Sequence, residues 1–254
     1  GVDARVNDWP IIKDSLYHDQ KLINFLNMNT GDQKYIDEFK SYMGTTKLTN
    51  YEDNSISQTM RVSLKDSVKS KSIYNYNGFV TQLIINYIKH KTGDDYEKLL
   101  NKIFADKVKI KYSILPYRNS GTGQGKLHPT ISATRYDWLR IAKAIMDDYQ
   151  NDTCVGKYLK TIYERRISKS NRDKNEPLFG RTKTYGGQFH MDYPGLKDRV
   201  VFGFGGYGGN AILIDVEKSR IVVVNSVHYN NKKFKYNVKK LLIDPIKKGK
   251  WKNF

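Results

Sequence analysis

Residues 72–93 constrain the fold more than any other stretch, because they combine a turn, one apolar helix and a glycine stop. Asn77-Gly78 is a turn dipeptide, since glycine adopts positive φ freely and asparagine tolerates it. The apolar residues that follow recur at helical spacing on one face: Phe79, Leu83, Ile84, Tyr87 and Ile88. Cations in the last turn, followed by Gly93, are typical of a helix C-terminus. The sequence therefore predicts a helix with Tyr76 held in a fixed place just before its N-terminus.

The length and composition are those of a folded protein. A chain of 254 residues can bury a sizeable core in one or two domains. Its 39% hydrophobic and 13% aromatic content is ordinary for a globular chain. No apolar run approaches the ~20 residues that span a bilayer, and the N-terminus lacks the apolar region of a signal peptide. Cys154 is the only cysteine, so no intrachain disulfide is expected and the compartment stays undetermined.

The net charge of +18 is large enough to attract an anionic polymer or membrane surface. The lysines are spread along the whole chain rather than gathered in one basic helix. No recognition helix, zinc finger or aromatic-basic RNA motif is present. A solvated lysine-rich surface is therefore the favoured interpretation, and nucleic acid is not a favoured partner.

The residue pattern changes from helical to strand-like along the chain. We expect a mainly helical subdomain over residues 1–165 and an antiparallel sheet with a C-terminal helix over residues 166–254. The strand candidates are Thr184–His190, Arg199–Gly206, Asn210–Val216 and Arg220–His228.

Details within the strand-rich part lead to three further expectations. The β-branched run Ile221–Val224 is expected to be buried on both faces. Glu217–Ser219 is short enough to be a hairpin connection. Residues 235–246 read as a closing helix, interrupted or ended near Pro245.

Three landmarks, in this order, resemble one family. The first is a short helix over residues 21–31, which ends at a glycine and follows a loop ending at Pro10. The second is the tyrosine turn at 76–78, followed by a helix that ends in Thr-Gly. The third is the start of a long helix at residues 132–140. Together they resemble the penicillin-recognising serine hydrolases, which include class C β-lactamases, D-alanyl-D-alanine carboxypeptidases, related esterases and 6-aminohexanoate-oligomer hydrolases.

The resemblance covers nearly the whole chain and implies its fold. The expected fold is mixed, α+β or α/β, and β-lactamase/transpeptidase-like. It has an antiparallel sheet flanked by helices and a helical subdomain, with the N-terminal strands missing.

The resemblance also implies a role for the tyrosine turn. Tyr76 stands where the family has the tyrosine of its Tyr-x-Asn or Tyr-x-Ser motif, although Gly78 occupies the third position. Tyr76 would therefore be the general base, with Asn77 and Gly78 beside the substrate. A free phenol has a pKa of ~10, and an adjacent ammonium would favour its phenolate.

A second set of residues matches the strand edge that holds the oxyanion in this family. Phe204, Gly205, Gly206 and Tyr207 stand where the family has Lys/His-Thr-Gly and the following residue. By this resemblance the N–H of Tyr207 would be the oxyanion donor, and glycines let a substrate approach the backbone closely. Because Phe204 replaces the cation, esterase-like and aminohexanoate-oligomer-hydrolase-like substrates are favoured over penicillin-like ones. A glycine-rich hairpin between two core strands is the alternative.

The family's nucleophile has no counterpart in the sequence. No serine is followed three residues later by lysine; Ser132 with Arg135 comes nearest, and arginine does not deprotonate in proteins. We therefore expect a fragment or separately encoded part of a serine hydrolase for a small ester or amide substrate, without a cofactor. Two missing strands would leave a sheet edge at residues 220–228 open to a partner chain, self-association or a rearranged N-terminal segment.

Other kinds of site have less support. The five histidines lack a metal-binding spacing, and no Gly-x-Ser-x-Gly elbow is present, although a Ser-His-Asp triad stays open. His190, near Tyr185, is interpreted as structural rather than as a pocket residue. The alternative function is a non-catalytic binding protein of the same fold, which uses its basic surface for anionic partners.

Overall fold

The structure is a computed structural model. It describes residues 1–13, 15–31, 73–76, 78–112, 115–117, 130–169, 182–206, 210–225 and 239–250. The chain packs into two compact units. One comprises Gly1–Leu99 with Ile114–Ser132, and the other comprises Leu100–Ser113 with Ala133–Phe254.

The second unit includes two helices from the predicted helical region over residues 1–165. Helices α6 (Arg135–Gln150) and α7 (Cys154–Glu164) belong to the second unit, where they pack on each other and α6 packs on the sheet. The sequence pattern identified their helical period but not the surface against which they pack. None of the described helices is long and apolar enough to cross a membrane.

Among the described residues, the first unit is mainly helical. Its described elements are η1 (Pro10–Ile12), α1 (Leu22–Leu26), α4 (Gly78–Thr92), η2 (Gly93–Asp95) and the antiparallel pair β1 (Leu115–Tyr117) and β2 (Thr130–Ser132). Helix α5 (Tyr96–Asn101) and the π-helical turn η3 (Lys102–Lys107) then lead toward the second unit along the chain. The expected helices around residues 22–26 and 78–92 are confirmed.

Helix α4 is fixed to the N-terminal loop by one carboxylate and one ring. Asp8 accepts hydrogen bonds from Tyr87 Oη at 2.9 Å and from Lys91 Nζ at 2.6 Å. Trp9 is buried beside the Tyr87 ring, with centroids 5.9 Å apart. The helix ends at Gly93, whose φ of 52° is a left-handed conformation that suits glycine.

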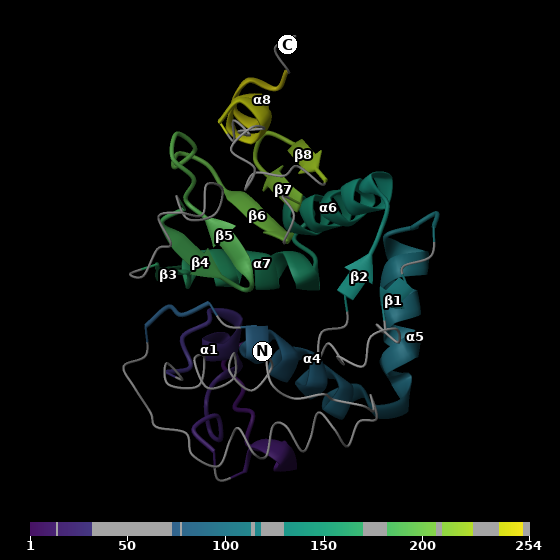
Figure 1. The fold of residues 1–254 in the computed structure, drawn as a ribbon, viewed down its shortest axis with the longest axis vertical. Coiled ribbons are helices and arrows are strands. Elements are labelled where there is room, and N and C mark those ends of the chain that lie inside the picture. Colours follow the sequence, from purple (N-terminus) through teal and green to yellow (C-terminus); the bar gives the residue numbers. More distant parts are fainter. Residues whose placement is uncertain are drawn as a thin grey trace, which may run out of the picture. The chain divides into compact units, whose positions relative to one another are not determined.

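In the described part of the second unit, six strands form an antiparallel sheet in which neighbours in sequence are neighbours in space (Figure 1). The strands are β3 (Ile167–Ser168), β4 (Thr184–Gly186), β5 (Phe189–Met191), β6 (Val201–Gly206), β7 (Asn210–Asp215) and β8 (Arg220–Val224). The expected strands near 201–206 and 210–215 and the hairpin at 217–219 are confirmed.

One predicted strand is in fact two. Residues 184–190 were expected to form a single strand, but Gly187 and Gln188 take φ values of 57° and 70° and reverse the chain between β4 and β5. Positive φ at both central positions matches the right-handed twist of a two-residue hairpin. Glutamine is not a typical residue for such a turn, so the sequence pattern did not predict the turn.

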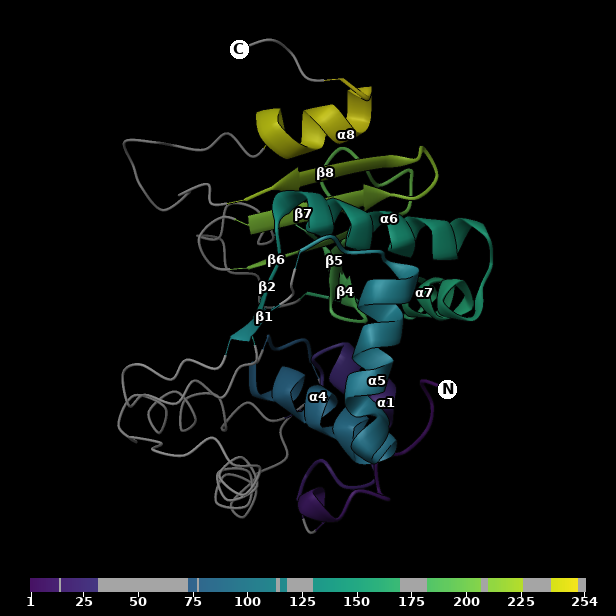
Figure 2. The same ribbon diagram turned by 90° about the vertical axis from the view of Figure 1, so that its right-hand side faces the viewer.

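Helices cover both faces of the sheet. On one face Phe202 packs edge-on against Tyr149 of α6 and Tyr163 of α7, at 5.8 and 6.1 Å between ring centroids. On the other face a core cluster brings strand residues together with the η5 (Lys239–Ile243) and α8 (Asp244–Lys248) segment. Figure 2 shows α8 against β8. The members of this cluster are Tyr193, Leu196, Val201, Ala211, Leu213, Val222, Leu242 and Ile246.

The last strand departs from expectation in its burial. Residues 221–224 were expected to be buried on both faces, but Val222 alone among them is fully buried, at 6% exposure, and its neighbours are partly exposed. The physical reason is position, because β8 is the terminal strand in the order of the described sheet. Residues 226–228 of the expected strand lie outside the described residues.

The closing helix is also arranged differently from the prediction. Pro245 does not end it but lies in the first turn of α8, where a missing N–H costs nothing. The helix continues to Lys248 and stops at Gly249, whose φ is 69°.

Candidate functional site

The tyrosine turn lies directly before α4 in the first unit. Tyr74 is buried at 4% exposure, and the N–H of Asn75 donates to the carbonyl of Met28 at 2.8 Å. Tyr76 follows with 59% of its surface exposed, and Gly78 is the first residue of α4. Asn77 lies outside the described residues. The backbone directly before Tyr76 is therefore held by a hydrogen bond, and the Tyr76 side chain is largely exposed.

The electrostatic surroundings of Tyr76 do not by themselves activate it. Desolvation raises the pKa of the Tyr76 phenol, so the neutral form is favoured. A base role needs the opposite shift, which requires a cation close to the hydroxyl. The turn holds Tyr76 in position, and activation of its phenol as a base depends on such a cation.

The glycine-rich part of the predicted site forms the end of β6 in the second unit. Phe204, Gly205 and Gly206 pair with Ile212, Ala211 and Asn210 of β7. Toward β5 the only register pair of β6 is His190 with Gly203. Beyond Gly203, this edge of β6 therefore has no partner strand in the part of the chain that the structure describes.

The backbone at this strand end is accessible. Gly205 and Gly206 are exposed, and a Cβ built on Gly206 meets no atom within 4 Å. Strand N–H and C=O groups without a neighbouring strand are available to another molecule. Tyr207, the expected oxyanion donor, lies outside the described residues.

Phe204 belongs to a partly exposed aromatic cluster rather than to a charged one. Its ring packs edge-on against Trp138 of α6 at 6.2 Å and against Phe189 of β5 at 5.6 Å. All three side chains are partly exposed. The surface beside the open end of β6 is thus apolar and aromatic, and it suits an uncharged group better than a carboxylate.

The predicted site residues therefore fall into two groups. Phe204, Gly205 and Gly206 are consecutive on one strand of the second unit, whereas Tyr76 and Gly78 belong to the first unit. Each group has a defined local geometry of its own.

Sequence reasoning did not identify a cavity in the second unit that several charged residues line. It has a volume of about 310 Å³ and is lined by residues of η3, α6 and the α6–α7 turn. The lining residues are Lys107, Val108, Arg140, Lys143, Ala144, Asp147, Asp148, Asn151 and Thr153. A sequence signal existed in the Lys143 and Asp147 pair, which is spaced for one helix face.

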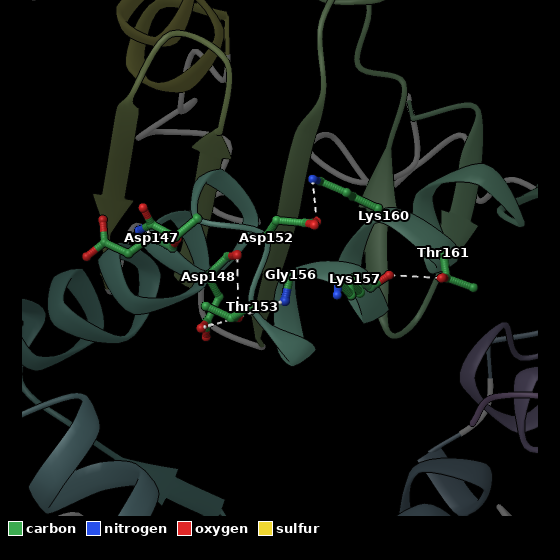
Figure 3. Close-up of polar contacts among 9 residues, drawn as sticks. Asp147, Asp148, Asp152, Thr153, Gly156, Lys157, Lys160 and Thr161 are labelled. Carbon is green, nitrogen blue, oxygen red and sulfur yellow. Dashed lines mark hydrogen bonds and ion pairs between the residues drawn. The ribbon is translucent and has the colours of Figure 1, made fainter.

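The charges of this cavity are already paired. Lys107 forms an ion pair with Asp148, and Lys143 with Asp147. Thr153 Oγ1 donates to Asp148 Oδ1 at 2.7 Å and caps α7 by accepting from the Gly156 N–H at 3.1 Å (Figure 3). These contacts stabilise the α6–α7 corner and leave no uncompensated charge to select a ligand.

A lysine and a histidine lie together near the other end of the sheet. Lys169 is 5% exposed, and its Nζ lies 2.9 Å from Thr182 Oγ1 and 3.1 Å from His190 Nδ1. Burial, together with the nearby ammonium, holds the pKa of His190 well below its usual value. Tyr185 packs edge-on against the imidazole at 5.0 Å between ring centroids. The contacts suit the structural role expected for His190.

Among the described residues, no group of three or more histidine, cysteine or carboxylate side chains could hold a metal ion. Comparison of the sequence with models of known protein families and with curated proteins found no match.

Proposed function

We propose that the chain carries two catalytic parts of a β-lactamase-related serine hydrolase that cleaves an ester or amide bond through an acyl-enzyme. Tyr76 is the general base, and the end of β6 binds the carbonyl oxygen through the N–H of Tyr207. Because no serine of the chain stands three residues before a lysine, the nucleophile and its lysine come from polypeptide outside this sequence. The observation that supports the proposal most is the glycine end of β6, which pairs with β7 but beyond Gly203 has no described partner toward β5.

The fold supports the proposal at a coarser level. The expected arrangement has a sheet covered by helices on both faces, with a C-terminal helix on one of them. In the second unit α6 and α7 pack on one face, and the η5–α8 segment packs on the other. We propose that this unit is the sheet-containing part of a β-lactamase/transpeptidase-like fold and that β8 is the edge that pairs with further strands.

Chemistry assigns the parts of the reaction as follows. The serine hydroxyl attacks the carbonyl carbon and loses its proton to the Tyr76 oxygen. Strand N–H groups stabilise the negative charge that develops on the carbonyl oxygen. The leaving alcohol or amine takes the proton back, and water then releases the acyl group. The lysine ammonium lowers the pKa of the phenol against the desolvation that raises it.

The proposed substrate is uncharged beside the scissile bond. Phe204 takes the place of the family's cation and packs on Trp138 and Phe189. A carboxylate brought onto this aromatic surface would lose water without gaining an ion partner. An alkyl or aryl group would gain the hydrophobic contribution of the same surface.

Binding and turnover test the proposal separately. Backbone amide NMR shifts are recorded while an uncharged amide analogue of p-nitrophenyl butyrate is added, with a matched analogue carrying a carboxylate as control. We expect shifts at Gly205 and Gly206 with the uncharged analogue and much smaller shifts with the charged one. Phe204→Lys is expected to reverse this preference. Equal or absent shifts contradict the substrate assignment.

Turnover is measured with a chromogenic β-lactam and a p-nitrophenyl ester. The chain alone is expected to hydrolyse neither above the rate of a Tyr76→Phe variant. Rapid hydrolysis that Tyr76→Phe abolishes would show that the nucleophile is within this chain, against the proposal.

A second candidate function has a specific observation in its favour. The last turn of α4 exposes Lys89, His90 and Lys91 on a chain whose net charge is +18. Such a surface binds polyanions through counterion release, and the affinity falls steeply with salt. Heparin binding at moderate salt, without labelling by a fluorophosphonate, would favour a non-catalytic binding protein; no heparin binding would remove this candidate.

A further inference from the structure

Three buried polar side-chain atoms, one of them in the residue before Tyr76, have no hydrogen-bond partner in the part of the chain that the structure describes. They are Asn29 Oδ1, Thr30 Oγ1 and Asn75 Nδ2. Thr30 is 1% exposed. A buried polar atom without a partner destabilises the folded state, and most such atoms in native proteins are satisfied by protein or by ordered water.

Backbone hydrogen bonds join the two segments that carry these side chains. The N–H of Asn75 donates to the carbonyl of Met28, immediately before Asn29 and Thr30. On the other side, Gln20 Nε2 donates to the carbonyl of Thr30 at 2.9 Å, and the N–H of Asn29 donates to the carbonyl of Asn24 at 3.0 Å. The backbone groups of this region are thus hydrogen-bonded, whereas the three side-chain atoms have no hydrogen-bond partner among the described residues.

We infer that Asn29, Thr30 and Asn75 form an internal water-binding site that ties the Tyr76 turn to the end of α1. The donor and acceptor types select this ligand. Asn29 Oδ1 only accepts, Asn75 Nδ2 only donates, and the Thr30 hydroxyl does either. A water molecule has two donors and two acceptors, so it satisfies such a mixed set.

The same set does not suit an ion. An amide N–H donor repels a cation, and the three atoms include no carboxylate to bind one. An anion would meet the Asn29 carbonyl oxygen, which is an acceptor. Buried waters typically make about three hydrogen bonds to otherwise unsatisfied groups. A neutral ligand with both donors and acceptors is therefore the class that fits.

The site gives the Tyr76 turn a fixed position without using Tyr76 itself. Asn75 is the residue directly before Tyr76, and its own N–H is already bonded to Met28. A water bonded to the Asn75 side chain and to the Asn29–Thr30 turn adds a second tie between the same two segments. The inference holds whether or not the chain takes part in hydrolysis.

Hydrogen exchange of the Asn75 amide tests the inference in the full chain. Thr30→Val replaces the hydroxyl with a methyl group of similar size. If the hydroxyl binds water, the substitution breaks a tie, and the Asn75 amide is expected to exchange about tenfold faster. If the hydroxyl is simply unsatisfied, removing it relieves the cost, and exchange is unchanged or slower, which overturns the inference.

Matched variants control for unrelated effects. Thr30→Ser keeps the hydroxyl and is expected to restore most of the protection. Thr92→Val removes a hydroxyl that already bonds to the Ile88 carbonyl at 2.8 Å in the same unit, and Asn75 exchange is expected to stay as in the unsubstituted chain. Amides of β7 serve as an internal reference. Should Thr30→Val not fold, a crystal structure of the unsubstituted chain decides. A water within hydrogen-bond distance of at least two of the three atoms supports the inference, and none there overturns it.

Discussion

Gly203 and Gly206, both in β6, are glycines for different physical reasons. A Cβ on Gly203 would overlap the hydroxyl of Tyr193, whose ring is buried in the core against the η5–α8 segment. A Cβ on Gly206 would meet nothing within 4 Å. Packing therefore requires glycine at the first position, whereas only the approach of a ligand would require it at the second.

We expect these two positions to separate stability from binding. Gly203→Ala should lower the free energy of unfolding by about 1–3 kcal/mol, because a well-packed core does not accept an extra methyl group. Gly206→Ala should leave stability within about 0.5 kcal/mol, yet weaken binding of the uncharged amide analogue. Urea denaturation and the NMR titration provide the two readouts. Equal destabilisation by both substitutions would contradict this assignment.

The titration of His190 predicts a dependence of stability on pH. Its pKa is held well below the usual value by burial and by Lys169, so the folded state keeps the imidazole neutral. The unfolded imidazole takes up a proton near pH ~6.5. Below that pH the unfolded state binds more protons, so stability falls as pH decreases.

The measurement is the unfolding free energy from pH 8 down to pH 5. We expect a decline that begins near the unfolded pKa and is flatter in His190→Gln, which lacks the titrating group. The same slope in both proteins would show that His190 does not contribute.

At the scale of elements, the N-terminus of α6 joins a cap to a buried carboxylate. Thr134 Oγ1 accepts from the Asp137 N–H at 3.1 Å and donates to Asp137 Oδ2 at 2.8 Å. Asp137 is fully buried and also accepts from the Lys111 N–H and from Arg140, both at 2.9 Å. Burial raises the pKa of Asp137, but these hydrogen bonds and the Arg140 charge outweigh it, and the pKa is lowered.

Loss of this cap should destabilise the second unit. Thr134→Ala is expected to cost about 1 kcal/mol, the usual value for an N-cap, or more because Asp137 also loses a donor. Thr134→Ser keeps the hydroxyl and should cost clearly less. Urea denaturation followed by circular dichroism measures both; an Ala variant as stable as the Ser variant would contradict the role of the hydroxyl.

The elements that could be predicted are those with a strong local signal. Helix α4 follows from the spacing of Leu83 and its apolar neighbours together with the stop at Gly93, and β6 and β7 follow from their apolar runs. The β4–β5 reversal at Gly187 and Gln188 could not be predicted, because glutamine is an unusual residue at positive φ. Partial exposure of β8 depends on its terminal place in the sheet order, which is a property of the assembled strands.

The candidate site shows the same limit. The glycine run of β6 and the neutral Phe204 are visible in the sequence, and the structure adds that Phe204 packs on Trp138 and Phe189. The Lys169–His190 contact joins residues that are distant in sequence and whose types give no periodic signal. The three unsatisfied atoms near Tyr76 depend on burial, which no local pattern encodes.

At the scale of the whole molecule, the proposed reaction needs two groups that belong to different units, the phenol of Tyr76 and the strand end of β6. Each part has a local geometry that suits its proposed role: an anchored and exposed Tyr76, and an accessible glycine backbone beside an aromatic surface. Hydrolysis requires both parts to act on one substrate, because general base and oxyanion donor act on atoms of the same reacting group.

A crystal structure of the chain with the uncharged amide analogue bound would test this requirement. We predict that the analogue's carbonyl oxygen accepts a hydrogen bond from the N–H of Tyr207 and that the Tyr76 hydroxyl contacts the same bound molecule. A structure in which the Tyr76 hydroxyl and the Tyr207 amide lie on separate surfaces, with no hollow between them, would contradict it.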